Sequence, residues 1–176
     1  MHRSSILSLA VFAVAAVASA GASAKGESAT AELRNLKGEV VGTATLTQQG
    51  EDVAVKGTVK GLPAGIHAFH IHQVGKCEPP FTSAGPHYNP HNKEHGHENP
   101  QGAHVGDLEN VDVKSENAET IFEQTVKSVR LHADQGPAIL DADGAALVFH
   151  AKPDDYKSDP AGNAGDRLVC GVIEMK

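Results

Sequence analysis

Short runs of alternating apolar and polar residues, each closed by a turn signal, limit what this chain can fold into. In EDVAVKGTVKGL, one face of a strand would carry Val53, Val55 and Val59, and the other Lys56 and Thr58. The runs EVVGTATLTQ, AALVFH and RLVCGVIEM are similarly short, and turn sequences such as QQGED and DADG separate them. No sustained 3.6-residue period follows the first 24 residues. The pattern predicts an all-β domain, an antiparallel sandwich or flattened barrel.

Two long segments interrupt this rhythm. The first, at about 74–108, carries five of the nine prolines and five of the eleven histidines, and the second covers 151–166. Loops of this length are usually functional or disordered. Because predicted strands bound the first segment and it contains a cysteine, we expect it to be ordered by something that it binds. No repeat or linker divides the chain.

The N-terminus has the pattern of a secretory signal. Arg3 precedes an apolar run at 6–18, and the small residues ASA follow at 22–24. The run is too short for a stable membrane span, although an uncleaved anchor is the alternative. We therefore expect a signal peptide at 1–24, a single domain at 25–176, and a periplasmic or secreted protein.

The charge and the composition argue against two classes of partner, nucleic acids and membranes. Without Arg3 the formal charge changes from −7 to −8, so the exported chain is modestly acidic. It has no basic stripe and few aromatic residues, which argues against nucleic acid as a partner. No second apolar span follows the first, so we expect no membrane association.

The chain has two cysteines, Cys77 and Cys170, both in the exported part. An oxidising compartment favours a disulfide between them, closing a loop of about 94 residues. Two free thiols are the alternative.

Three histidines lie within the stretch GIHAFHIHQVG. Residues two apart share a face of a strand and residues three apart do not. His70 and His72 would therefore project together as half of a metal site. His67 would project to the other face and bond a backbone carbonyl there.

The first long segment offers enough ligands for a zinc site. His104 and Asp107 lie three apart in HVGD, a spacing that suits a chelating turn. Three imidazoles and one carboxylate form a closed tetrahedral set that would be structural and would order the loop. The alternative is a solvated histidine-rich loop that binds metal loosely. His91 and His97 belong to that alternative, because four ligands suffice without them.

His150 ends the run AALVFH, where a predicted strand enters the second long segment. If it faced His70 and His72, the three imidazoles would form a nitrogen-rich site suited to copper. Spacing alone does not establish that pairing.

Four separated motifs, GIHAFHIH, GPHYNP, HVGDL and GNAGDRLVCGVI, together resemble the copper/zinc superoxide dismutase family. The resemblance runs from about residue 31 to the C-terminal end, with the motifs in the family's order. It implies a Greek-key β-barrel that binds one copper and one zinc ion per chain. The implied copper ligands are all histidines: His70, His72, His87 and His150. The implied zinc ligands are three histidines and a carboxylate: His87, His95, His104 and Asp107.

The resemblance also implies a reaction and the residues that carry it. Superoxide would be converted to dioxygen and hydrogen peroxide by redox cycling of copper, while zinc would be structural. His87 would bridge the two metals as an imidazolate and pass a proton to the nascent peroxide. Asp154 would link a copper-side to a zinc-side histidine, and Arg167 would orient the anion. The alternatives for these two are a solvated loop aspartate and an exposed arginine at a strand start. Cys77 and Cys170 match the family disulfide.

An acidic protein that acts on an anion needs local positive charge, because its net charge repels the substrate. Besides copper and Arg167, we expect Lys157 and Lys93 to contribute. The extra residues EPPF before TSAGPH and the short second loop differ from the intracellular eukaryotic type and resemble the bacterial exported branch. These differences leave open whether the protein is a monomer or a homodimer.

Two other function classes compete with the enzyme. A copper or zinc carrier on the same barrel would lack copper ligands or the active-site arginine, and neither is missing here. A catalytically silent sandwich for adhesion would not need seven ligand positions. A zinc hydrolase is disfavoured, because the zinc set leaves no open position.

Overall fold

The computed structural model describes residues 26–133 and 136–176, and the predicted signal peptide, residues 1–24, lies outside them. Within these ranges the regular elements are nine strands and one turn of 3₁₀ helix, η1 (Thr82–Ala84). This confirms the predicted all-β class. None of the described residues form a helix long and apolar enough to cross a membrane.

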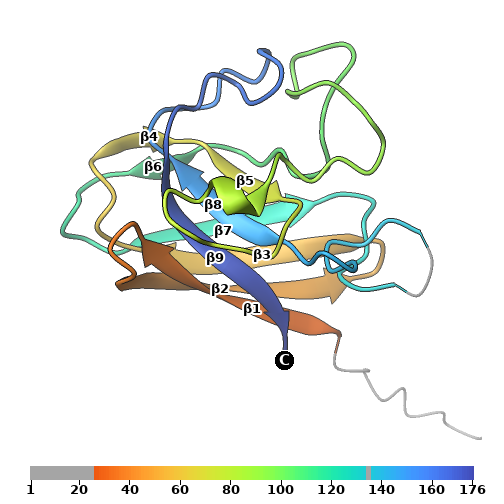
Figure 1. The fold of residues 1–176 in the computed structure, drawn as a ribbon, viewed down its shortest axis with the longest axis horizontal. Coiled ribbons are helices and arrows are strands. Elements are labelled where there is room, and N and C mark those ends of the chain that lie inside the picture. Colours follow the sequence, from red (N-terminus) through yellow and green to blue (C-terminus); the bar gives the residue numbers. More distant parts are fainter. Residues whose placement is uncertain (1–25, 134–135) are drawn as a thin grey trace, which may run out of the picture.

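Seven strands form one antiparallel sheet in the order β5-β8-β9-β1-β2-β3-β7, and β4 pairs with β6 in a second, two-stranded sheet. Several neighbours are not consecutive in the chain, as in a Greek key. Figure 1 shows the large sheet curling into a flattened barrel. The strands are β1 (Ser28–Asn35), β2 (Val40–Gln49), β3 (Asp52–Val59), β4 (Gly65–His67), β5 (Phe69–His72), β6 (Val111–Val113), β7 (Thr120–Val126), β8 (Ala146–His150) and β9 (Arg167–Met175).

The predicted alternation places the core inside the barrel. Val53, Val55 and Val59 of β3 are buried, while Lys56 of the same strand is exposed. Three phenylalanines form the centre of the core. The rings of Phe69 and Phe149 stack at 4.3 Å, and that of Phe122 meets both edge-on, at 5.0 and 5.4 Å. Such aromatic pairs stabilise a core beyond the area that they bury.

Strand β8 alternates between two apolar clusters. Leu147 and Phe149 belong to the main core. Ala146 and Val148 project to the other side, into a smaller cluster completed by Phe81, Ala84 and Cys170, with Cys77 packed against it. The predicted disulfide between Cys77 and Cys170 is confirmed, with the Cα atoms 5.7 Å apart. It ties the first long loop to β9.

The two long loops emerge at the same end of the barrel (Figure 1, green and blue). The first joins β5 to β6 and the second joins β8 to β9. The Glu98 N–H donates to Tyr156 O at 3.0 Å, and Lys157 Nζ lies 2.8 Å from Glu98 Oε2. The loops therefore form one continuous layer over the end of the barrel.

Removing the disulfide should destabilise the fold mainly through the unfolded chain. Cys77 and Cys170 are 93 residues apart, and a loop of that length contributes about 4–5 kcal/mol in the chain-entropy model. We expect the double variant Cys77→Ala/Cys170→Ala to lose roughly that much unfolding free energy in urea titrations. An unfolding free energy within error of the wild-type value would contradict this.

Candidate metal centre

Strands β5, β8 and β9 bring the first functional side chains together. Phe69 and Ile71 of β5 face the main core, so His70 and His72 project to the opposite side. His150 is the last residue of β8 and is paired with Arg167, the first residue of β9, across an irregularity in the register. Irregularities of this kind redirect side chains at the rims of barrels.

Bridges between backbone segments return the first long loop to β5. His72 pairs with His87, and His70 pairs with Asp107. Between these bridges the Ile71 N–H donates to Gly106 O at 2.9 Å. A Cβ at Gly106 would lie only 2.3 Å from Ile71 O, so the close approach requires glycine.

Besides the smaller cluster of His70, His95 and Asp154, the side chains converge into two buried four-residue groups of possible metal ligands. Within each group the ligand atoms lie within 4.8 Å of one another, and every member is buried. His87 belongs to both. The first group contains only imidazoles: His70, His72, His87 and His150. The second contains three imidazoles and one carboxylate: His87, His95, His104 and Asp107.

The imidazole orientations in the first group fit a cation. Nδ1 of His72 donates to Gly85 O at 2.8 Å, and Nδ1 of His150 donates to Gly165 O at 3.2 Å. Their Nε2 atoms then face each other at 3.3 Å as two lone pairs. His70 Nδ1 and His87 Nε2 are also buried without a hydrogen-bond partner among the described residues. Buried lone pairs in this arrangement are satisfied by a metal ion, and an all-nitrogen set suits copper.

The second group has the spacing of a tetrahedral site. Asp107 Oδ1 lies 2.8, 3.0 and 3.1 Å from Nδ1 of His87, His95 and His104. Bonds of 2.0–2.1 Å to zinc imply ligand–ligand distances of about 3.3 Å. His95 Nδ1 is not in hydrogen-bond geometry with any partner in the described chain. Three nitrogens and one oxygen at these distances fit zinc.

Burial keeps the imidazoles of the first group neutral, as metal ligands must be. Desolvation lowers the pKa of His87 to about 4 and that of His150 to about 3, and it also lowers the pKa of His72 well below its usual value. His95, in the second group, differs. Burial would lower its pKa, but the Asp107 carboxylate 3.0 Å from its Nδ1 and the hydrogen bond from its Nε2 to Asp154 outweigh burial and raise it to about 9.

Asp154 joins the two groups. Its Oδ2 accepts a hydrogen bond from His70 Nε2–H at 2.6 Å, and its Oδ1 accepts one from His95 Nε2–H at 2.9 Å. These bonds direct the Nδ1 lone pair of each ring toward its own group. Asn110 holds the Asp154 backbone on both sides, at 2.8 and 2.9 Å. A Cβ at Gly162 would lie 1.9 Å from Asp154 Oδ1, so this loop too closes tightly on the carboxylate.

The second long loop is organised by Asp155. Its Oδ1 accepts the N–H groups of Lys157 and Ser158 at 2.9 and 2.8 Å. Its Oδ2 accepts the Ser158 hydroxyl and an Asn163 N–H at 2.7 and 2.8 Å. From this turn, Asp159 Oδ1 accepts the His95 N–H at 2.8 Å. The loop therefore holds both the ring and the backbone of His95.

One expectation from the sequence was wrong in its geometry. His67 does not share a strand with His70, because the chain divides at Ala68 into β4 and β5, which lie in different sheets. The backbone of Ala68 bonds instead to Lys152 O and to the His150 N–H, at 2.9 Å each. The expected role of His67 is confirmed: its ring nitrogens lie 2.7 and 2.8 Å from the carbonyls of His150 and Pro63.

The two histidines predicted to lie outside the site have different surroundings. His97 Nε2 lies 2.9 Å from the carbonyl of Asp107, so this ring is bonded to the loop and is not simply a solvated side chain. His91 is exposed and belongs to neither group. Of the two lysines expected to attract an anion, Lys93 is exposed and Lys157 is paired with Glu98, which offsets its charge.

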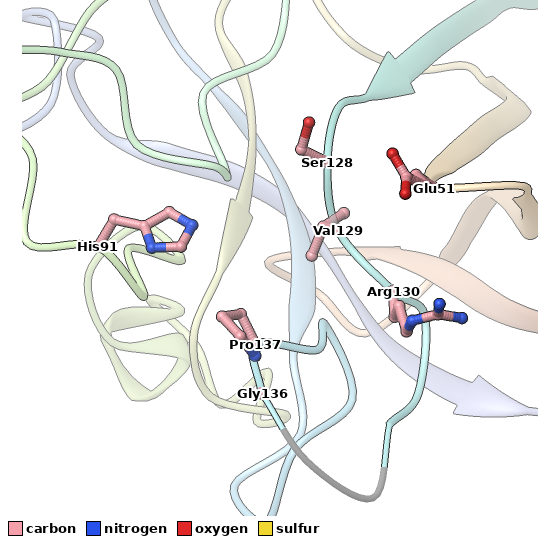
Figure 2. A pocket seen from close by; sticks show the side chains of 7 residues that line it. All are labelled: Glu51, His91, Ser128, Val129, Arg130, Gly136 and Pro137. Atoms are coloured by element: carbon pink, nitrogen blue, oxygen red, sulfur yellow. The ribbon is translucent and has the colours of Figure 1, made fainter.

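His91 lines a surface pocket of about 360 Å³ that lies apart from both groups. Figure 2 shows its imidazole on one side of the pocket, while the Arg130 guanidinium on the other side points away from it. The polar side chains of this pocket do not converge on a common point. The buried groups, and not this pocket, are therefore the candidate site.

Several positioning groups carry no signal in the sequence. Arg167 Nη1 donates to Phe81 O at 2.6 Å, and its Nη2 donates to Gly85 O at 2.8 Å. Backbone carbonyls of this kind are present at every residue, so a sequence does not distinguish them. Asn110 and Asp159 are ordinary loop residues until the fold brings them to Asp154 and His95.

Comparisons with known proteins agree with this geometry. The family model described as copper/zinc superoxide dismutase matches residues 40–173. A relative from Aquifex aeolicus, named superoxide dismutase [Cu-Zn] 2, is 46% identical over 148 residues, which cover 82% of this chain and 85% of the relative. Superoxide dismutase [Cu-Zn] from Caulobacter vibrioides is 40% identical over 149 residues, covering 84% and 86%.

A solved structure gives the same result for the fold. The crystal structure of a SOD-like protein from Bacillus subtilis superimposes with a TM-score of 0.76 at 36% sequence identity. The match covers 81% of this chain and 96% of that one.

Asp154→Ala should weaken metal binding at both groups. The substitution removes the acceptor for one ring N–H in each group, and such outer partners are typically worth about 10–100-fold in metal affinity. We expect losses of this size for copper and for zinc in competition titrations with chelators. Asp112→Asn, an exposed carboxylate on β6, is the matched control. A loss confined to one metal would show that Asp154 does not couple the groups.

The turn at Asp155 should respond to acid. Hydrogen bonds from the Ser158 hydroxyl and from the N–H groups of Ser158 and Lys157 lower the Asp155 pKa. A lowered folded-state pKa stabilises the fold above the unfolded value of about 3.9, and this stabilisation is lost as the pH falls through the folded value. We expect the amide chemical shifts of Lys157 and Ser158 to titrate with a midpoint below 3.9. Asp155→Asn should abolish this transition, whereas a wild-type midpoint at or above 3.9 would refute the assignment.

Proposed function

The chain belongs to the copper/zinc superoxide dismutase family, and from that premise we propose that it converts superoxide to dioxygen and hydrogen peroxide. Two superoxide anions and two protons give one molecule of each product. The observation that carries the proposal is the pair of buried ligand groups that share His87, with Arg167 beside the first of them. A structural or adhesive role would require neither the buried lone pairs nor the guanidinium.

The donor sets assign the two metals. Copper would be held by the four imidazoles of the first group: His70, His72, His87 and His150. Zinc would be held by the second group: His87, His95, His104 and Asp107. When bound, copper supplies the one-electron redox couple, and zinc fixes the loop and the shared imidazole.

The chain's own residues bind the anion and deliver a proton. Arg167 lies opposite His150 in the β8–β9 register and is half-buried, so its guanidinium can bind superoxide out of bulk water. His87 Nε2 is buried without a partner among the described residues and faces the same side. This nitrogen would hold a proton and release it to the reduced oxygen species, while Nδ1 remains directed at Asp107.

Family membership alone does not decide the activity, because the Bacillus subtilis protein of the same fold is described only as SOD-like. A copper or zinc carrier is the second candidate. The observation against it is that Arg167 is fixed by two carbonyl acceptors beside the first group, an arrangement that metal storage does not require. We also propose that the protein acts outside the cytoplasm. The signal pattern at 1–24 and the disulfide both support export.

Metal content and superoxide dismutation of the wild type and His150→Ala test the proposal together. We expect about one copper and one zinc per chain in the wild type, as the two donor sets imply. His150→Ala removes a copper ligand, so dismutation should fall by more than about 100-fold while zinc is retained, since even outer partners cost 10–100-fold.

His91→Ala is the matched control, because this histidine is exposed and lies outside both groups. It should retain wild-type metal content and activity. A wild-type protein that binds both metals but dismutates no faster than free copper would be a carrier, and the enzymatic proposal would be wrong.

A further inference from the structure

The half-buried guanidinium of Arg167 is held at both ends by the first long loop. Nη1 donates to the carbonyl of Phe81 at 2.6 Å, and Nη2 donates to that of Gly85 at 2.8 Å. The Gly85 carbonyl also accepts the Nδ1–H of His72 at 2.8 Å. These two carbonyls therefore set the position of the guanidinium relative to the first ligand group.

Two residues of the loop that supplies the carbonyls, Phe81 and Ala84, are buried in one apolar cluster, and Phe81 has much the larger side chain. Among residues 78–83 only Phe81 is buried, with 1% of its surface exposed. Its ring packs in the small cluster on the outer side of β8 and β9, together with Ala84, Ala146, Val148 and Cys170. The flanking Pro80 and Thr82 are exposed. Phe81 is the last residue of the stretch EPPF.

The backbone of Phe81 adopts a conformation that phenylalanine rarely takes. Its φ of 70° lies in the left-handed region, where side chains other than glycine are disfavoured. The Phe81 N–H donates to Glu78 O at 2.6 Å, and its carbonyl accepts the Ala84 N–H at 3.2 Å as well as Arg167. Local preference does not account for this conformation, so the buried ring must hold it in place.

The disulfide alone does not fix the carbonyl. Cys77 is four residues before Phe81, and the three residues between them are exposed. The hydrogen bonds of Glu78 join this segment to Ser83 and Phe81 of the same loop and not to the barrel, so the tether at Cys77 does not by itself attach the Phe81 carbonyl to the barrel. The ring is the next point at which the loop is attached to the barrel.

We propose that Phe81 is a positioning residue, whose buried ring fixes its own carbonyl so that Arg167 is held ready to bind an anion beside the first ligand group. The proposal rests on the proposed function for the identity of that anion. The position of the guanidinium is a property of the chain and can be measured separately.

The first test measures the guanidinium directly by NMR, in the zinc- and copper(I)-loaded mature protein, which is diamagnetic. In the wild type the Arg167 Nη–H protons should exchange with water more slowly than those of the exposed Arg130. Phe81→Gly removes the ring but tolerates the left-handed backbone. We expect it to accelerate this exchange by about 10-fold or more, as loss of a charge-assisted hydrogen bond implies. Phe81→Leu should restore most of the protection.

Phe122→Ala provides the matched control for stability. Its ring is buried in the main core against Phe69 and Phe149 and does not belong to the cluster around Phe81. We expect this variant to unfold more easily while the Arg167 exchange stays at the wild-type rate. Equal acceleration in Phe122→Ala would mean that general destabilisation explains the result, and the proposal would fail.

The second test uses azide, a small monoanion, titrated into the copper(II) protein and followed by its absorption. Phe81→Gly should weaken azide binding by about 10-fold at unchanged metal content. In an Arg167→Lys background the same substitution should have no further effect, because Phe81 acts through Arg167. Independent, additive losses in the double variant would overturn the proposal.

The outcomes separate this proposal from the function. If the wild type does not dismutate superoxide but Phe81→Gly still frees Arg167, the functional proposal fails and the positioning role remains. If Phe81→Gly folds and Arg167 stays protected, the positioning role is wrong whatever the activity. If Phe81→Gly does not fold, Phe81→Asn, which also tolerates the left-handed backbone, is measured in its place with the same expected direction.

Discussion

The rest of the structure depends on one constraint: the buried imidazoles and carboxylates of the two ligand groups must find bonding partners without water. Polar atoms removed from water need partners, and several ring nitrogens here have none among the described residues. The N–H groups of these rings are already committed outward, to carbonyls or to Asp154, so the remaining lone pairs face one another. A metal cation satisfies several such lone pairs at once. Metal binding and loop order are therefore one thermodynamic event in this family member.

The barrel supplies the geometry that the loops alone do not. Strand β8 packs one side chain after another into two different apolar clusters, which leaves little freedom to the strand that ends at His150. The register irregularity after Phe149 then sets His150 opposite Arg167. Asp154 completes the arrangement from the second loop, because it orients one ring of each ligand group. A shift of β8 or of its register would misplace His150 of the first group, whereas a shift of Asp154 would misplace one ring in each group.

Much of this could be predicted from the sequence, because the strand period of two is a local property. It gave the all-β class, the buried face of β3, and the common direction of His70 and His72. The same rule failed between His67 and His70, since it assumes one continuous strand and the chain changes sheets at Ala68. Strand β7 was not predicted; it exposes Ile121 at 79% and places Gln124 on the more buried face, so its apolar–polar alternation is weak.

The spacing of residues in the sequence did not predict which distant ligand residues meet in the fold. That His87 faces both ligand groups, and that His150 meets His72, follows from the long loop folding back on β5. The motif resemblance assigned these residues, whereas local pattern left them open. The carbonyls of Phe81 and Gly85 were beyond either approach, because a backbone acceptor has no sequence signature.

The proposed binding of an anion by this acidic chain depends on a positive charge close to the site. Lys157 is paired with Glu98, so it adds little net positive charge near the loops. Beyond a Debye length of about 8 Å the net negative charge is screened, and only charges close to the site then act on the substrate. Arg167 is such a charge, since it is half-buried and fixed by two acceptors. A fixed guanidinium loses less entropy when it binds an anion than a flexible lysine does. The loop carbonyls that fix Arg167 are therefore as much a part of the proposed anion site as the guanidinium itself.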